Sequence, residues 1–309
     1  MPGFMPGIHA LDRKQGVDGR DKPGHDMMET RLQIDPRINP YRSDLAAKHL
    51  QGKVEAARFV EGGRREVVRP TAPLRGAPSP EARQVTEALM GERIIVYEAN
   101  EEGWAWGQLE NDGYVGWIPA NAIADSGPAP THKVAALRTL AFPGADIKLP
   151  PFAGLPMGAL LTISRQDERF AVTSAGLHIP SAHLVPVGQK KSDFVAIAEL
   201  FLGAPYLWGG KTSLGLDCSG LVQVSLQAAG IACPRDSDLQ ERALGAPSRL
   251  ETLRRGDLVF WQGHVAIARN SASLLHANAH HMAVAVEPVA EAIARIKAAG
   301  SEVTSVKRL

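Results

Sequence analysis

The chain has 309 residues, 44% of them hydrophobic, so it is long enough to form two or three domains with cores of their own. Its 34 basic and 33 acidic residues leave a formal net charge of +1, which argues against a nucleic acid or an anionic membrane as partner. The cysteines, Cys218 and Cys233, form neither a CxxC pair nor a zinc cluster, so we expect free thiols, a reducing compartment, no metal and no cofactor.

The N-terminal sequence is broken by Gly and Pro and lacks the apolar run of about 7 to 15 residues that a signal peptide needs. No stretch approaches the roughly 18 consecutive apolar residues of a membrane-spanning helix. We therefore expect a cytoplasmic protein without membrane insertion. We assign residues 1–40 to a disordered segment, or to a start placed too early, with Met27 or Met28 as the true one.

Short strands and turns are expected between residues 71 and 125. Three apolar segments, Ile94–Tyr97, Trp104–Leu109 and Tyr114–Ile118, are separated by Glu-Glu-Gly and Asn-Asp-Gly, which is typical of hairpins. A weaker copy follows, because "MGERIIVYEA…GWIPANAI" is echoed by "MGALLTISRQ…LHIPSAHL". We predict two small β-barrels, one in residues 41–126 with an N-terminal extension and one in residues 127–188.

The pattern becomes helical near residue 190 and favours an α+β domain over residues 189–309. Ser192 is the expected N-cap of a helix that stops at Gly203, and a second helix is expected from Cys218 to Gly230. Four strands and a last helix should follow, in "GDLVFW", "HVAIARN", "SLLHAN", "MAVAVEPV" and residues 290–299. Cys218 would then lie at a helix N-terminus.

This position suggests a nucleophile. Backbone N–H groups and the helix dipole at an N-terminus favour a thiolate, so we expect a lowered pKa for Cys218. His264 opens a strand from which it could reach the thiol as a base, and His276 lies on the next strand, where it could orient the imidazole. On these residues alone, the alternative that Cys218 is a buried structural cysteine stays open.

Six short motifs occur in an order that resembles the NlpC family of papain-like cell-wall peptidases. They are "PYLWGG", "DCSG", "PRDSDLQ", "RRGDLVFW", "HVAIA" and "LLHAN". The preceding segments resemble bacterial SH3-like domains. The resemblance implies two SH3-like β-barrels followed by a papain-like catalytic domain, with Cys218 as nucleophile, His264 as base and His276 as the orienting residue.

The resemblance also implies substrate contacts. Tyr206 matches a tyrosine whose hydroxyl helps to hold the oxyanion or the substrate. In the subgroup of γ-D-glutamyl-L-diamino-acid peptidases, an Asp at the position of Asp236 binds the free α-amine of L-Ala, although Asp236 could also be a turn or helix cap. The other implied contacts are Ser219, Ser237, Tyr114 and a glutamate, either Glu87 or Glu92.

We therefore expect a cysteine peptidase that cleaves the γ-D-glutamyl–diamino-acid bond of peptidoglycan stem peptides with a free N-terminal L-Ala, in peptidoglycan recycling. The diamino acid, meso-diaminopimelate or L-Lys, is left open, and a monomer is expected. One alternative is a cell-wall binding or scaffold protein with an inert papain-like domain. Another is an amidase or acyltransferase with the same Cys–His machinery. We do not expect His280 and His281 to bind a metal, because the period of a strand would send them to opposite faces.

Overall fold

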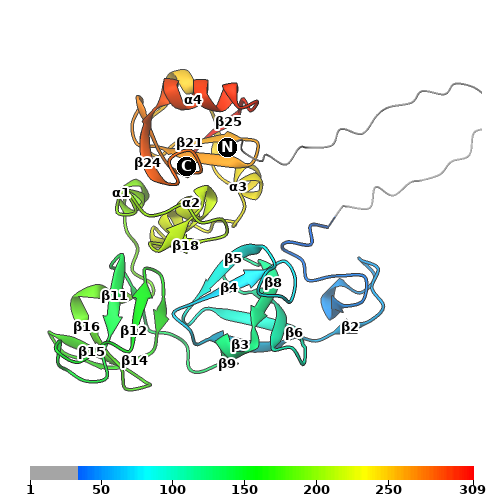
Figure 1. The fold of residues 1–309 in the computed structure, drawn as a ribbon, viewed down its shortest axis with the longest axis vertical. Coiled ribbons are helices and arrows are strands. Elements are labelled where there is room, and N and C mark those ends of the chain that lie inside the picture. Colours follow the sequence, from blue (N-terminus) through cyan, green and yellow to red (C-terminus); the bar gives the residue numbers. More distant parts are fainter. Residues whose placement is uncertain (1–33) are drawn as a thin grey trace, which may run out of the picture. The chain divides into compact units, whose positions relative to one another are not determined.

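A computed structural model describes residues 34–309 (Figure 1). Met27, Met28 and most of the segment predicted as disordered lie outside the described residues. Residues 34–40, which we had placed in that segment, instead include a turn at 36–38, and Arg37 in this turn contacts Asp236 of the C-terminal domain. An N-terminal arm (residues 34–60) continues with β1 (Ala46–Ala47), η1 (Lys48–Leu50) and β2 (Phe59–Val60).

The first β unit (residues 63–125) is a seven-stranded sheet with the order β5-β4-β8-β7-β6-β3-β9. Its hairpin turns contain Gly103 and Gly113 at φ of 84° and 75°, a left-handed conformation that glycine adopts without strain. Alternate residues such as Leu74, Ile94 and Ile118 fill its core. The elements are β3 (Gly63–Val67), β4 (Thr71–Arg75), β5 (Gln84–Leu89), β6 (Arg93–Ala99), β7 (Trp104–Leu109), β8 (Val115–Pro119), η2 (Ala120–Ala122) and β9 (Ile123–Asp125).

The second β unit (residues 132–186) has a separate core around Val134, Leu155 and Ile179. Its strands form three small sheets, β13-β10-β17, β11-β12 and β14-β15-β16. Its identity as a second SH3-like barrel stays a prediction. The elements are β10 (His132–Val134), β11 (Arg138–Ala141), β12 (Ala153–Pro156), β13 (Leu160–Leu161), β14 (Ile163–Gln166), β15 (Phe170–Thr173), β16 (His178–Pro180), η3 (Ser181–His183) and β17 (Leu184–Pro186).

The C-terminal domain (residues 194–308) packs helices on both faces of a six-stranded antiparallel sheet with the order β20-β25-β21-β22-β23-β24. Along β21, Leu258 and Phe260 face the core that includes α2, whereas Val259 and Trp261 face the core that includes α4. The elements are α1 (Phe194–Glu199), β18 (Lys211–Thr212), β19 (Gly215–Leu216), α2 (Cys218–Ala228), α3 (Ser237–Ala243), β20 (Ala246–Ser248), η4 (Leu250–Thr252), β21 (Leu258–Trp261), β22 (His264–Ala268), β23 (Ser273–Asn278), β24 (Ala283–Pro288), α4 (Val289–Ala298) and β25 (Val303–Arg308).

Two local expectations were wrong, and one pair of strands was missed. The N-cap of α1 is Asp193, whose carboxylate accepts hydrogen bonds from Val195 N and Ala196 N, and not Ser192. His280 and His281 lie in the turn between β23 and β24 and not on a strand. The edge pair β20 and β25 was missed because both strands are short and partly polar, so no clear alternation marks them.

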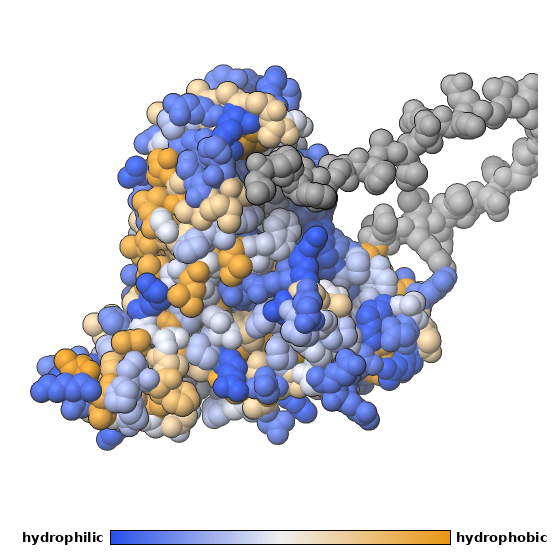
Figure 2. Space-filling model, viewed as in Figure 1, coloured by the Kyte–Doolittle hydropathy of each residue, from blue (hydrophilic) through white to orange (hydrophobic). Residues whose placement is uncertain are grey.

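On the face shown in Figure 2, apolar residues gather over the region of α1 and α2. The segment between these helices carries exposed large apolar side chains, among them Leu207, Trp208 and Leu214. Arg83 of the first β unit lies 5.9 Å from the Trp208 ring, so part of this apolar segment contacts the first β unit. Within residues 34–309, no helix is long and apolar enough to cross a bilayer.

Candidate active site

Helix α2 begins at Cys218, as expected, because Asp217 caps it. The Asp217 carboxylate accepts hydrogen bonds from Gly220 N at 2.7 Å and from Gly209 N at 2.7 Å, which satisfies a free N–H of the first turn. A Cβ on Gly220 would lie 2.3 Å from the carbonyl oxygen of Gly210, so only glycine lets the hairpin β18–β19 approach this closely. The thiol is therefore held at the start of a tightly packed helix.

Arg235 is the buried centre of this part of the site. Its Nη1 and Nη2 donate to both oxygens of Asp217 at 2.9 and 2.8 Å, and Nη1 also donates to Ser219 Oγ at 2.9 Å. Its Nε donates to Thr86 Oγ1 of the first β unit at 2.9 Å. One guanidinium thus fixes the residues on either side of Cys218 and ties them to the first β unit.

A chain of hydrogen bonds begins at His264, the first residue of β22. His264 Nε2 lies 2.9 Å from His276 Nδ1, and His276 Nε2 lies 3.0 Å from Glu287 Oε2. Arg295 of α4 holds Glu287 with two hydrogen bonds of 2.8 and 2.6 Å. The Trp261 ring packs against the His264 ring at 5.6 Å between centroids. Four side chains from β22, β23, β24 and α4 therefore form one relay.

This relay determines which nitrogens carry protons. An ionised carboxylate only accepts, so His276 must donate from Nε2 and its Nδ1 must accept. His264 then donates from Nε2, which leaves its Nδ1 unprotonated and without a hydrogen bond to any described residue. Arg295, the largest influence, and then His276 lower the pKa of Glu287 to about 2, which keeps the carboxylate ionised. An imidazole with a free Nδ1 can take the proton of a thiol.

The lowered pKa expected for Cys218 was wrong. Burial, and second the Asp217 carboxylate, raise the pKa of Cys218 to about 12, and these effects outweigh the backbone amides of Val265 and Ser219 and the charge of Arg235, which lower it. Burial also lowers the pKa of His264 to about 3 and that of His276 to about 4. The free site therefore holds a neutral thiol and a neutral imidazole.

Tyr206 lies beside this centre. Its backbone N–H donates to Met282 O at 2.9 Å, and it forms a bridge with Leu216 just before the nucleophile. Burial, followed by the proximity of Cys218, raises the pKa of the Tyr206 phenol, so the hydroxyl stays protonated and can donate. This placement is compatible with the predicted contact to the oxyanion or the substrate.

Asp236, next to Arg235, is bound by the first β unit and by the N-terminal arm. Its Oδ2 accepts from Tyr114 Oη at 3.1 Å and from Arg37 Nη1 at 2.8 Å, and among the described residues nothing donates to its Oδ1. It occupies the N-cap position of α3 without a side-chain cap hydrogen bond, which argues against the reading as a helix cap. Ser237 begins α3, and Ser219 is buried against Asp217.

The two candidate glutamates of the first β unit bind Lys211, and their contact with the substrate stays a prediction. Glu87 accepts from the backbone N–H of Lys211 at 2.9 Å, and Glu92, which is 5% exposed, pairs with Lys211 Nζ at 3.1 Å. Neither is hydrogen-bonded to Asp236 or Tyr114, because both carboxylates bind the hairpin β18–β19. They join the first β unit to the C-terminal domain.

The described residues include no group of three His, Cys, Asp or Glu side chains that could hold a metal ion. Cys218 and Cys233 are both free and buried. The site offers a thiol, a base with a fixed tautomer and a carboxylate at hydrogen-bonding distance from a tyrosine. This arrangement can carry out nucleophilic acyl transfer.

Two family models match the chain. Residues 74–123 match the bacterial dipeptidyl-peptidase SH3 domain, and residues 203–300 match the NlpC/P60 family. The C-terminal domain belongs to the NlpC/P60 family. The chain therefore combines an SH3 domain of this bacterial type with an NlpC/P60 domain, as the resemblance predicted.

Two curated relatives of the chain are named γ-D-glutamyl-L-lysine dipeptidyl-peptidases. The Bacillus subtilis relative is 29% identical over 194 residues, which cover 57% of this chain and 63% of the relative. The Bacillus cereus relative is 26% identical over 232 residues, covering 70% of this chain and 63% of the relative. The chain thus spans less than two thirds of the length of either relative.

Solved NlpC/P60 structures have a similar fold. An NlpC/P60 family protein from Bacillus cereus aligns with a TM-score of 0.68 at 19% identity, over 80% of this chain and 99% of that protein. An NlpC/P60 endopeptidase from Photobacterium damselae subsp. piscicida aligns with a TM-score of 0.56 at 15% identity, over 79% of this chain and 71% of that protein.

Sequence reasoning missed several residues around the NlpC/P60 site. Arg235 stands inside the quoted motif "PRDS", so a charged residue beside Asp236 was a usable signal. Glu287 and Arg295 depend on the pairing of β24 with β23 and on the position of α4, which no local pattern gives. Arg37 is 199 residues from its partner Asp236 and carries no sequence signal at all.

Proposed function

We propose that this protein is a cysteine peptidase that hydrolyses the bond between γ-D-glutamate and an L-diamino acid in peptidoglycan stem peptides. The observation that carries the proposal is the contact of α2, which begins at Cys218, with β22, where the hydrogen-bond relay leaves Nδ1 of His264 free. The names of the curated relatives support the choice of bond.

The chemistry follows from the relay. Nδ1 of His264 takes the thiol proton as Cys218 Sγ attacks the γ-carbonyl carbon, and the oxyanion is stabilised by Tyr206 Oη and the backbone N–H of Cys218. His264 then protonates the leaving amine of the diamino acid, which leaves a γ-glutamyl thioester on Cys218. Water, deprotonated by His264, hydrolyses the thioester and restores the thiol.

We further propose that Asp236 selects peptides with a free N-terminal L-Ala. Tyr114 and Arg37 both hold Oδ2, so Oδ1 is available to an incoming ammonium group. An N-acylated peptide brings no positive charge and would bury this oxygen without a partner. The arrangement differs from our expectation, because Arg37 already compensates part of the charge of Asp236.

A preference for free N-termini supports a role in recycling. In the intact wall the stem peptide is acylated at its N-terminus, so a pocket for a free α-amine fits released peptides. We propose a cytoplasmic protein that acts, as a monomer, on such peptides, with either meso-diaminopimelate or L-Lys as the diamino acid.

The test is cleavage of L-Ala-γ-D-Glu-meso-diaminopimelate and of its N-acetylated analogue, followed by mass spectrometry. We expect cleavage of the free peptide only, its loss in Cys218→Ala, and its retention in the matched control Cys233→Ala. Equal cleavage of both peptides would remove the amine-binding role of Asp236. Cleavage of neither by folded protein would contradict the peptidase proposal and favour a binding or acyltransferase protein.

A further inference from the structure

A cavity lies where the two β units meet the C-terminal domain. It has a volume of about 460 Å³ and is lined from the C-terminal part of α2 by Val224, Gln227 and Ala228. Ala228 is ten residues along α2 from Cys218, a rise of about 15 Å. The cavity is therefore separate from the candidate active site, and its size falls within the range of roughly 300–1,000 Å³ of small-molecule sites, which often lie between domains.

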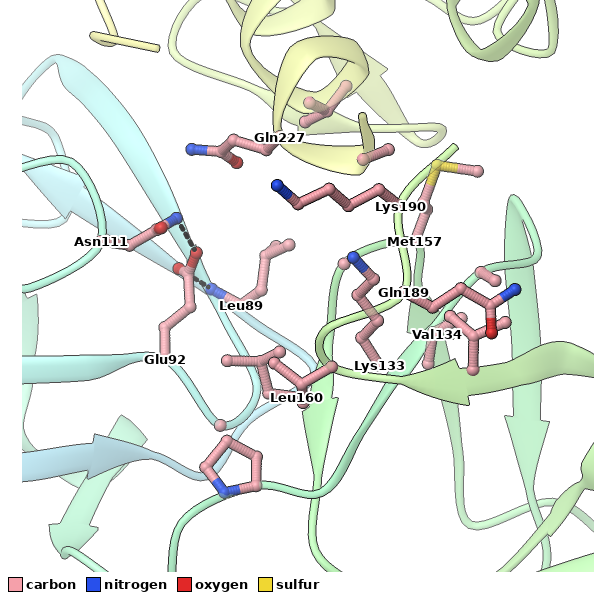
Figure 3. Close-up of a pocket in the computed structure, with 18 of the residues that line it drawn as sticks. Leu89, Glu92, Asn111, Lys133, Val134, Met157, Leu160, Gln189, Lys190 and Gln227 are labelled. Carbon is pink, nitrogen blue, oxygen red and sulfur yellow. Dashed lines mark hydrogen bonds between the residues drawn. The ribbon is translucent and has the colours of Figure 1, made fainter. Parts of the chain in front are cut away.

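Its walls are largely apolar. Leu89, Leu160, Val134 and Met157 contribute side chains from the first and second β units, and Ile197 contributes one from α1 (Figure 3). A ligand that fills this space would bury hydrocarbon against three parts of the protein at once.

The charged side chains that line the cavity leave an excess of positive charge. They are Glu92, Arg93, Glu110, Lys133, Lys190 and Lys191. Both carboxylates are engaged elsewhere, because Glu92 pairs with Lys211 and Glu110 pairs with Arg64. Among residues 34–309, no ion pair is formed by Lys133, Lys190 or Lys191.

The geometry directs two of these cations into the cavity. The ammonium groups of Lys133 and Lys190 extend into the space between Leu89, Leu160 and Gln227 (Figure 3). Lys190 is exposed at the open side, where its hydrocarbon stem packs so closely on Gly230 that a Cβ there would lie 2.5 Å from it.

A third cation has an unused donor. Nε of Arg93 is buried and has no hydrogen-bond partner among the described residues, although its Nη2 donates to Gly127 O at 3.2 Å. Burial, and second the charge of Lys190, lower the pKa of Lys133, so an anion between the two lysines would relieve a real electrostatic cost. An unused buried donor is unfavourable until a partner arrives, and an anion would also reduce the repulsion between the two ammonium groups.

We propose that this cavity binds a small organic anion with an apolar body, its charged group between Lys133 and Lys190 and its hydrocarbon against Leu89, Leu160 and Met157. The ligand would link the second β unit to α2 and the first β unit. The proposal does not depend on the function assigned to Cys218.

Titration calorimetry on the full chain tests it with three probes. Octanoate carries both a charge and an apolar body, octan-1-ol only the apolar body, and inorganic phosphate only the charge. We expect octanoate to bind with one site per chain, and at least about tenfold more tightly than either other probe, since a charge-assisted contact and apolar burial each contribute.

Lys133→Met and Lys190→Met remove the ammonium groups and keep the length of the side chain. Each should weaken octanoate binding about tenfold or more, whereas the matched control Lys148→Met, at an exposed lysine between β11 and β12, should not change it. Circular dichroism and thermal unfolding show that each variant is folded, and Lys→Gln variants replace any that are not. Octanoate binding that is the same in all variants, or no tighter than that of octan-1-ol or phosphate, would overturn the proposal.

Discussion

Glu287 should control the reaction rate although it does not touch the substrate. In Glu287→Met the side chain keeps its approximate volume, but His276 Nε2 loses the acceptor that now lies at 3.0 Å. Nothing then favours the tautomer in which His276 Nδ1 accepts a hydrogen bond from His264 Nε2. In its alternative tautomer His264 carries the proton on Nδ1, and this nitrogen must be unprotonated to accept the proton of the thiol.

The size of the effect follows from that one hydrogen bond. A hydrogen bond to a charged group contributes about 1.5–3 kcal/mol, and 1.4 kcal/mol corresponds to a factor of ten. Losing this preference should lower kcat about 10- to 100-fold and leave KM nearly unchanged, because Glu287 lies outside the proposed substrate contacts.

The assay is steady-state cleavage of L-Ala-γ-D-Glu-meso-diaminopimelate, combined with ¹⁵N NMR of labelled histidines to report the tautomers of His264 and His276. Arg295→Met is the matched control, because it removes the other partner of Glu287 and leaves the Glu287 carboxyl group beside His276. Its kcat should fall much less. A Glu287→Met variant with unchanged histidine tautomers, or one matched in kcat by Arg295→Met, would refute the reasoning.

Three further results are expected. Tyr206→Phe should lower kcat roughly 10²–10³-fold without abolishing cleavage, and full activity would remove its hydroxyl from the mechanism. Lys211→Met leaves the buried Glu92 carboxylate without its cation and should reduce the free energy of unfolding in urea by about 3–5 kcal/mol. Adding Glu92→Gln to this variant should restore part of that stability. An unchanged midpoint of urea unfolding in Lys211→Met would contradict this prediction. Burial raises the pKa of Asp236 while Arg235 and Arg37 lower it, so KM for the free-amine peptide should rise as pH falls through that raised pKa. Arg37→Met should move this rise to higher pH, and an unshifted profile would exclude the coupling.

The parts of the fold that the sequence predicted are those set by local patterns. The helix at Cys218 could be predicted because an Asp cap, an apolar stripe and the stop at Gly230 all lie within fourteen residues. Strands β21 to β23 have four to six residues each, which are either continuously apolar or alternate between apolar and polar. These strands could therefore also be predicted. In the same way, His264 and His276 could be placed on adjacent strands before their contact was seen.

What could not be predicted depends on tertiary position. Glu287 meets His276 because β24 pairs with β23 with His276 opposite Ala285, which puts Glu287 two residues further along the same face. The pKa of Cys218 was predicted in the wrong direction because the helix N-terminus is visible in a sequence and the degree of burial is not. The contacts of Glu87 and Glu92 with Lys211 could not be predicted for a related reason, since Lys211 is more than a hundred residues away from both.

The candidate site contains two charge networks, one that includes His264 and one that includes Asp236. Glu287 and Arg295 orient the base, whereas Arg37 and Tyr114 hold the carboxylate of Asp236, and no described hydrogen bond joins the two sets. Separate networks should give additive free energies, so Glu287→Met should act on kcat, Arg37→Met on KM, and the double variant should show the product of the two effects. A clear departure from that product in kcat/KM would mean that binding at Asp236 also positions the scissile carbonyl against the thiol, and that recognition and chemistry share one network.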